Sequence, residues 1–252
     1  MLRGMVSRFL VAAVFLVVLT TACGGDGEGE TAAEPQATVE MGAEPPAAFD
    51  PADFSPEVDH PLVPLTSVRL TVFEGSERDP ETGETIEIRI ESRVLEKTDR
   101  VAGVEVAVVE VKDYEDDELV ERTLDYYAQH ADGSVWYLGE RVDDYEEGEI
   151  VGHEGQWLAG EGDAKPGLFM PAEPEVGDAF EQERAPGIAE DRSTVLEVGL
   201  QVTAPAGEFS DCVKTEDFAP LDNLTEFKYY CHGVGLVREE PEGGIIELVR
   251  YR

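Results

Sequence analysis

Apolar residues alternate with polar ones along most of the chain after residue 60, and this pattern predicts β-strands. The clearest runs begin at Val68, Ile86 and Val104, and each places aliphatic side chains on every second position. Because successive side chains of a strand point to opposite faces, such runs predict a sheet with one apolar and one polar face. Turn-forming residues such as Asp79-Pro80 and Gly103 separate the runs, which indicates antiparallel strands.

The segment 118–160 is the expected centre of the fold. It contains both tryptophans, and the pairs Asp132-Gly133 and Glu147-Gly148 within it are typical of hairpin turns. Aromatic side chains bury the largest apolar area, so we expect the core to form on this meander. Apolar residues fall on alternate positions in two runs, first at Val120, Leu124, Tyr126 and Ala128 and then at Val151, Gly155 and Trp157.

Further strands are predicted in the C-terminal part, at residues 195–202, 209–218, 226–232, 234–239 and 245–251. No window keeps a helical period over several turns, and the one candidate helix lies within residues 179–191. A slip in the alternation at Val108-Val109 suggests a β-bulge. Residues 160–174, rich in Gly and Pro, are expected to form a long loop that could act as a lid.

These patterns predict an all-β fold. We expect a mostly antiparallel curved sheet of about ten strands, shaped as a half-barrel or a flattened barrel.

Residues 1–22 have the features of a bacterial export signal. Arg3 and Arg8 precede an uninterrupted apolar run at residues 9–19, and small residues follow it up to Ala22. The run is too short to cross a bilayer as a helix, so we expect a cleaved signal peptide.

Cys23 is the candidate site of lipidation. It directly follows the small residues, which resembles the lipobox of bacterial lipoproteins, where this cysteine becomes the lipid-modified first residue of the mature protein. Thr20 stands where that motif usually has leucine, and an ordinary secretory signal is the alternative. Residues 23–60 form the predicted acidic, disordered linker, because their Gly-, Ala-, Pro- and Glu-rich composition cannot bury enough apolar surface to fold. Residues 61–252 form the single predicted β-rich domain.

The chain is strongly acidic, with 56 Asp and Glu residues against 19 Lys and Arg residues. We therefore expect no nucleic-acid partner, since phosphates would be repelled. Two similar acidic stretches, residues 113–120 and 144–151, suggest either the reuse of one hairpin turn or a pair of calcium-binding loops. Neither has the spacing of an EF-hand, so the hairpin interpretation is preferred and neither a metal site nor a cofactor is predicted.

Cys212 and Cys231 are the two cysteines left for pairing in an exported protein. They lie on consecutive predicted strands, and antiparallel pairing of these strands would bring them opposite one another. We predict a structural disulfide. The alternatives are a redox couple, which lacks the Cys-x-x-Cys spacing, and a metal site with His232, whose side chain would point to the other face of the strand.

No motif of a known enzyme class is present. The chain has no Gly-x-Ser-x-Gly elbow and no His-Glu-x-x-His pair, so no catalytic residue is assigned. His153, beside Glu154 and near Trp157, is the one cluster with a candidate role in acid–base chemistry. A pair of carboxylates acting on a glycoside is the other.

Several phrases of the chain resemble a family of bacterial exported lipoproteins. The phrases are residues 126–129, 133–137, 167–171, 205–207 and 229–237, the last of which reads Tyr-Tyr-Cys-His-Gly-Val-Gly-Leu-Val. The similarity covers residues 68–250 and implies a lipid-anchored protein of the cell envelope, but it implies no activity. In architecture alone, the expected sheet also resembles the curved half-barrel of periplasmic lipoprotein carriers, which wrap an acyl chain.

Together these observations predict a membrane-tethered, extracytoplasmic lipoprotein of the cell envelope that binds an apolar ligand or an envelope protein without catalysis. The alternatives are a secreted hydrolase or glycan-active enzyme that uses a carboxylate pair or His153, and a calcium-dependent adhesion module. A lipid-binding role requires a continuous cavity lined by aliphatic side chains and by Trp136 or Trp157.

Replacing Cys23 with serine in the native host tests the membrane anchor. We expect Cys23→Ser to move the protein from the membrane fraction to the soluble extracytoplasmic fraction, because the acyl chains supply the binding energy. Immunoblots of separated fractions measure this, with Thr21→Ser as a control that keeps the cysteine. A Cys23→Ser protein that stays with the membranes would contradict the anchor.

Overall fold

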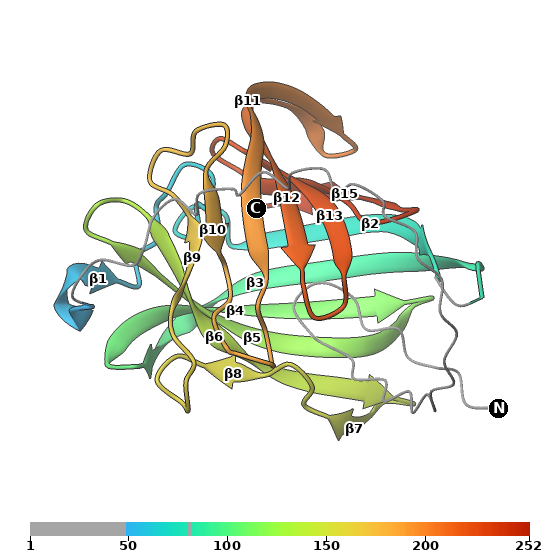
Figure 1. Ribbon diagram of the computed structural model, residues 1–252. Helices are drawn as coiled ribbons and strands as arrows, with labels where there is room; N and C mark the ends of the chain where they lie inside the picture. The colour runs from blue at the N-terminus through green and yellow to red at the C-terminus, as the bar shows by residue number, and fades with distance from the viewer. Residues whose placement is uncertain (1–48, 80–81) are drawn as a thin grey trace, which may run out of the picture.

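The computed structural model describes residues 49–79 and 82–252, and this part of the chain forms one large antiparallel sheet (Figure 1). The sheet has 15 strands, and its main path runs β10-β11-β12-β13-β14-β15-β2-β3-β4-β5-β6-β7. The all-β prediction is confirmed. The sheet curves so that its C-terminal strands lie over its N-terminal ones, but it is not closed into a barrel.

The strands follow the predicted alternation closely. They are β1 (Phe54–Ser55), β2 (Leu70–Arg78), β3 (Thr85–Val101), β4 (Val104–Glu115), β5 (Glu118–His130), β6 (Val135–Glu146), β7 (Glu149–Gly152), β8 (Trp157–Leu158), β9 (Gly167–Met170), β10 (Ala179–Glu181), β11 (Arg192–Ala204), β12 (Gly207–Ala219), β13 (Leu224–Cys231), β14 (Gly235–Glu240) and β15 (Ile245–Tyr251). All five strands predicted near the C-terminus are present as β11 to β15.

The candidate helix at residues 179–191 was wrong, since this segment contains the short strand β10 and then irregular backbone. The expected loop at residues 160–174 is partly ordered, because β9 pairs there with β6. Within the described residues, η1 (Pro51–Asp53) is a single turn of 3₁₀ helix, and no helix is long and apolar enough to cross a membrane.

The ordered part of the chain begins before residue 61. Asp50 accepts a hydrogen bond from the backbone N–H of Ala52 and so caps η1, and β1 pairs with β5. Phe54 of β1 packs edge-on against Trp136, with 6.3 Å between ring centroids. Val58 is fully buried. Cys23, the signal peptide and most of the predicted linker lie outside the described residues.

The β-bulge expected near Val108 exists, but its extra residues belong to β3, the neighbouring strand, and not to β4. Val94 of β3 pairs with Val109, and Thr98 pairs with Ala107. Residues 95–97 of β3 therefore lie opposite Val108 alone. The slip in the sequence pattern reflects the fact that β4 buries side chains on both faces there.

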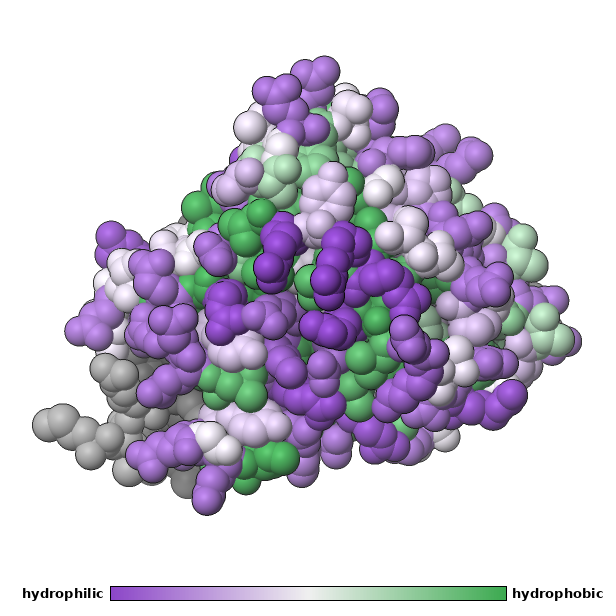
Figure 2. Space-filling model, turned by 180° about the vertical axis from the view of Figure 1, so that it is seen from behind, coloured by the Kyte–Doolittle hydropathy of each residue, from purple (hydrophilic) through white to green (hydrophobic). Residues whose placement is uncertain are grey.

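The core divides into two apolar clusters. One lies where the sheet bends and is built from β2, β3, β4 and from β11 to β15. The other lies on the hairpins of β4 to β6 and contains both Trp136 and Trp157. The tryptophan-containing segment thus forms core, but Val151, one of its predicted alternating positions, is 53% exposed on the edge strand β7. Figure 2 shows that the molecule seen from behind is mostly hydrophilic, with small hydrophobic areas between polar side chains.

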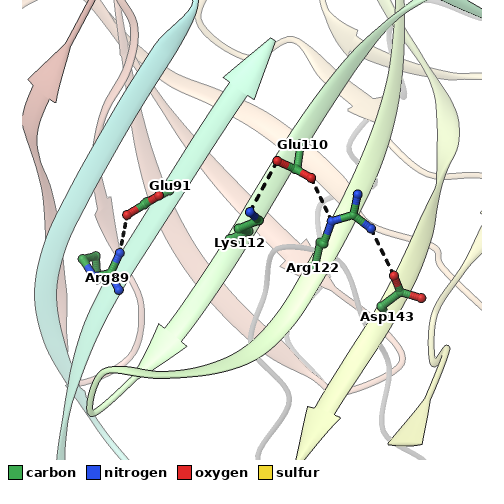
Figure 3. A network of polar contacts seen from close by, with 6 residues as sticks. All are labelled: Arg89, Glu91, Glu110, Lys112, Arg122 and Asp143. Carbon is green, nitrogen blue, oxygen red and sulfur yellow. Dashed lines mark hydrogen bonds and ion pairs between the residues drawn. The ribbon is translucent and has the colours of Figure 1, made fainter. Parts of the chain in front are cut away.

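The outer face of β3 to β6 carries a network of ion pairs (Figure 3). Arg122 of β5 donates to Glu110 at 2.8 Å and to Asp143 at 3.2 Å, and Lys112 lies 3.6 Å from Glu110. These side chains are partly exposed, so each pair stabilises the fold by at most about 1 kcal/mol. Alternation along the strands places Val109, Val111 and Thr123 on the other, inner face.

The predicted disulfide between Cys212 and Cys231 is confirmed. The two residues lie directly opposite one another on β12 and β13, and both are fully buried. They are separated by 19 positions, so the bond restricts the unfolded chain to a loop of modest length.

Replacing both cysteines with alanine should lower the free energy of unfolding by about 3 kcal/mol, because the unfolded chain regains the entropy of that loop. Urea unfolding of the double variant measures the change, with Cys23→Ser as a control that keeps the disulfide. An unchanged free energy of unfolding would show that the bond does not restrict the unfolded state.

Candidate functional site

A cavity of about 170 Å³ lies on the inner side of the curved sheet. Its walls near the bend are apolar and come from the loop before β2 and from β2, β3, β4 and β14. Exposed Arg69 and half-buried Leu65 and Val68 lie at this end, where the cavity approaches solvent. The apolar lining residues are Leu62, Val63, Pro64, Leu65, Val68, Leu70, Phe73, Ile90, Val94, Val109, Val111, Val234 and Leu236.

The other end of the cavity is acidic. Carboxyl side chains reach it from β5, β6, β13 and β14 and from the segment between β10 and β11. These groups are Asp125, Glu140, Glu183, Asp191, Glu226 and Glu239, and Lys228 is the cation among them. A pocket with a large apolar wall and a few converging polar groups is the usual form of a small-molecule site.

A bulge in β6 places two of the lining side chains. Asp125 pairs with Glu140, and Tyr127 pairs with Tyr137, so β6 uses one residue more than β5 between these pairs. Tyr137 and Glu140 therefore both face the cavity. Bulges beside functional sites often redirect a side chain in this way.

Gly139 makes this bulge possible. Its φ is +116°, and a Cβ added there would collide with the carbonyl oxygen of Trp157 on β8. Only glycine combines this backbone conformation with so close an approach of a neighbouring strand.

Aromatic rings join the two halves of the sheet across the cavity. Phe169 of β9 lies edge-on to Tyr127, with 5.0 Å between centroids, and edge-on to Tyr230 of β13, with 6.1 Å. Tyr127 also packs against Tyr137 at 4.9 Å. The segment predicted as a loop or lid thus contributes Phe169 to the interior of the site.

Lys228 is held by carboxylates of the C-terminal half. Its Nζ lies 2.7 Å from Glu226 Oε1 and 3.5 Å from Asp217 Oδ2, and Ser193 donates a hydrogen bond to Asp217 at 2.7 Å. Burial lowers the pKa of Lys228, but attraction by Glu226 and Asp217 outweighs this effect, and the pKa lies well above its ordinary value. The lysine is therefore charged and already paired.

The carboxyl groups on the opposite wall form no ion pair with a Lys or Arg of the described residues, although Lys228 attracts Glu183 from a distance. Burial raises the pKa of Asp125 to about 7. Burial, together with the nearby charges of Glu183 and Asp125, raises the pKa of Glu140 well above its ordinary value. Burial and the charge of Asp191 do the same to the pKa of Glu183, which the attraction of Lys228, the nearby Trp157 indole and the Asp191 backbone N–H oppose only in part.

Two further carboxyl groups beside Lys228 are also shifted. Burial raises the pKa of Asp191 to about 7 and that of Glu226 to about 8, although the attraction of Lys228 lowers both. At neutral pH this end of the cavity is thus a mixture of neutral and ionised carboxyl groups.

Several oxygens of this group have no hydrogen-bond partner among the described residues. They are Asp125 Oδ1, Glu140 Oε1 and both carboxylate oxygens of Glu183. The three side chains are only 3%, 1% and 2% exposed. Donors do lie nearby: the Thr123 hydroxyl beside Asp125, the Tyr137 hydroxyl beside Glu140, and the Trp157 indole and Asp191 backbone N–H beside Glu183. None of them reaches the length and angle of a hydrogen bond to these oxygens. Unpaired acceptors of this kind are costly when they are buried, so they mark a place where a donor could bind.

The tryptophans and His153, which the sequence analysis proposed for a cavity wall or for chemistry, do not line this cavity. Trp136 and Trp157 are buried beside it in the core, so the expectation that one of them would line an apolar cavity was wrong. His153 lies at the edge of the sheet with about half of its side chain exposed, where Nδ1 is 2.6 Å from Val142 O and 3.2 Å from Asp143.

The two similar acidic stretches are hairpin turns, as the preferred interpretation held. Asp116-Asp117 joins β4 to β5, and Glu147-Gly148 joins β6 to β7, with positive φ at all four residues. Among residues 49–79 and 82–252, no group of three or more His, Cys, Asp or Glu side chains is placed to hold a metal ion.

The sequence analysis missed the titratable residues of the cavity because it followed the apolar face of β5. Leu124, Tyr126 and Ala128 alternate as predicted, but their neighbours Asp125 and Tyr127 point into the cavity. The sequence held one signal. The many aromatic residues at 126–137 are consistent with strands that are covered on both faces, and the polar residues of such strands are buried as well.

Comparison with known proteins gives no relative: no family model, no curated protein and no solved structure matches this chain.

The raised carboxyl pKa values predict that the protein is more stable at pH 5 than at pH 8. These groups bind protons more tightly in the folded protein than in the unfolded chain, so lowering the pH from about 8 towards about 4 favours the folded state. A pKa that differs by one between the folded and unfolded states changes the free energy of unfolding by about 1.4 kcal/mol, and we expect this free energy to rise by more than about 2 kcal/mol from pH 8 to pH 5. His60, whose pKa burial lowers, opposes this below about pH 6.5, but it is a single group.

Urea unfolding at pH 5, 6.5 and 8 measures this dependence. Glu140→Gln should reduce the gain, because the amide does not titrate, whereas Asp143→Asn on the outer face of the same strand should not. A free energy of unfolding that falls steadily from pH 8 to pH 5 would contradict the prediction.

Proposed function

We propose that this protein is a membrane-tethered lipoprotein of the cell envelope whose β-domain binds a small, largely apolar ligand without catalysis. The observation that carries the proposal is the cavity on the inner side of the sheet, with its aliphatic walls. Apolar surface that is shielded from bulk water yet not filled by side chains favours an apolar occupant.

The size of the cavity restricts the ligand. A buried apolar cavity of about 150 Å³ can hold a benzene molecule, and pockets for drug-sized ligands reach about 300 Å³ or more. A cavity of about 170 Å³ therefore suits a single ring or a short alkyl chain. It is too small for the two acyl chains of a phospholipid. The resemblance to lipoprotein carriers, which wrap an acyl chain, therefore extends at most to a short chain.

The proposed location rests on the N-terminal sequence. The export signal at residues 1–22, the lipobox-like position of Cys23 and the acidic linker together favour an extracytoplasmic, membrane-anchored protein. The disulfide between Cys212 and Cys231 is consistent with an oxidising compartment. The cavity favours a small ligand over an envelope protein as the partner.

A hydrolase that uses carboxyl groups is the second candidate. Asp125 and Glu140 lie directly opposite one another on β5 and β6, both line the cavity, and both have a raised pKa. Such pairs can act as acid and base at one bond. His153, the other catalytic candidate from the sequence, lies outside the cavity.

Analysis of molecules that co-purify with the protein tests the proposal. The mature chain from the native host, extracted and analysed by mass spectrometry, should carry a small apolar molecule. Val68→Trp, which places a large ring at the solvent end of the cavity, should lose at least about 90% of it, a factor of ten in occupancy. Val198→Trp is the matched control, because Val198 is 46% exposed and does not line the cavity.

The possible results separate the candidates. Equal amounts of the molecule in Val68→Trp and Val198→Trp would show that the cavity is not the binding site. A molecule that is cleaved when it is returned to the purified protein, but not when it is returned to Glu140→Gln, would favour the hydrolase over the binding protein.

A further inference from the structure

We propose that the acidic end of the cavity binds the positively charged nitrogen of an amine, so that the ligand is a small amine with an apolar body. This inference rests on the proposed function and deepens it by naming the chemistry of the ligand's head group. The apolar walls near the bend of the sheet would hold the body, and the carboxyl groups of β5, β6 and the β10–β11 segment would hold the nitrogen.

The charges at this end of the cavity are unbalanced. Lys228 is already engaged by Glu226 and Asp217 on the C-terminal half of the sheet. On the facing wall, Asp125 and Glu140 lie opposite each other on adjacent strands, and Glu183 approaches from the β10–β11 segment. No Lys or Arg of the described residues forms an ion pair with these three carboxyl groups, and Lys228 attracts only Glu183 among them. A cation from outside would therefore find carboxyl groups that the protein does not pair.

Unpaired acceptors provide a second and independent observation. Asp125 Oδ1, Glu140 Oε1 and both oxygens of Glu183 are buried without a hydrogen-bond donor. A primary ammonium group carries three N–H donors and accepts none, so it can donate to buried carboxyl oxygens that lack a donor. Hydrogen bonds of this charge-assisted kind are about twice as strong as neutral ones.

The aromatic residues of the cavity favour the same head group. Tyr127 and Tyr137 lie on the same strands as Asp125 and Glu140, in the next inward-facing pair, and Phe169 packs against both rings. A cation near aromatic faces is attracted by their negative charge density. An anion would meet both these rings and the carboxylates, and it would be repelled.

Other occupants fit less well. The described residues include no group of side chains placed to hold a metal ion. A neutral alcohol could donate one hydrogen bond, but it would leave the remaining oxygens unpaired and the negative charge uncompensated. Burial is the main cause of the raised pKa values of Asp125 and Glu140, and no cation of the described residues lowers either of them.

A series of three probes with the same apolar body tests the inference: n-hexylamine, n-hexanol and hexanoate, each titrated calorimetrically into the full mature chain at pH 8. We expect n-hexylamine to bind at least about tenfold more tightly than n-hexanol, the range expected for a hydrogen bond to a charged group. Hexanoate should bind most weakly. Equal binding of the amine and the alcohol, or tightest binding of hexanoate, would overturn the inference.

Variants locate the binding site of the nitrogen. Glu140→Gln should weaken n-hexylamine binding about tenfold and leave n-hexanol binding unchanged. Asp143→Asn, on the outer face of the same strand, is the matched control and should change neither. Loss of amine binding in the control alone, or no change in Glu140→Gln, would place the nitrogen elsewhere and contradict the proposal.

The result also separates this inference from the function on which it rests. If n-hexanol binds as tightly as n-hexylamine and Val68→Trp blocks both, the apolar cavity is the site but the acidic end does not select amines. If none of the three probes binds, both the inference and the proposed function fail.

Discussion

The burial of carboxyl groups inside the curved sheet is the constraint on which the rest of this structure depends. Six of them line the cavity, with a single lysine among them. Taking a charged or polar group out of water without a full set of partners costs several kcal/mol, so the remaining interactions of the fold must offset that cost. Raised carboxyl pKa values reduce it, since the neutral form is easier to bury.

The interactions that offset the free-energy cost of this burial lie next to the site. Cys231, one residue after Tyr230 of the cavity wall, is bonded to Cys212, and the apolar cluster at the bend of the sheet surrounds that bond. On the other wall, Gly139 allows β8 to approach β6 and so turns Glu140 inward. Strain and unpaired polar groups commonly persist where the surrounding structure is rigid enough to hold them, and functional sites are the usual place.

The sequence was sufficient for the fold because the strands alternate and their turns are marked by Gly, Asp and Asn. It was also sufficient for the disulfide, since Cys212 and Cys231 lie on neighbouring strands. It was not sufficient for the site. Asp125 and Glu140 look like solvent-facing residues in a chain with so many carboxylates, and their burial follows from the curvature of the whole sheet and from one bulge. Alternation states which residues share a face, but it does not state which face is covered.

The central claim is that Asp125 and Glu140 lie inside this sheet, away from water and without an ion-pair partner. A pH titration of the side-chain carboxyl carbons by NMR, assigned through Asp125→Asn and Glu140→Gln, tests it most directly. The account predicts that Asp125 titrates near pH 7 and that Glu140 titrates well above the ordinary value of a glutamate. Ionisation of both groups at the ordinary values of exposed carboxylates, near about 4, would contradict it.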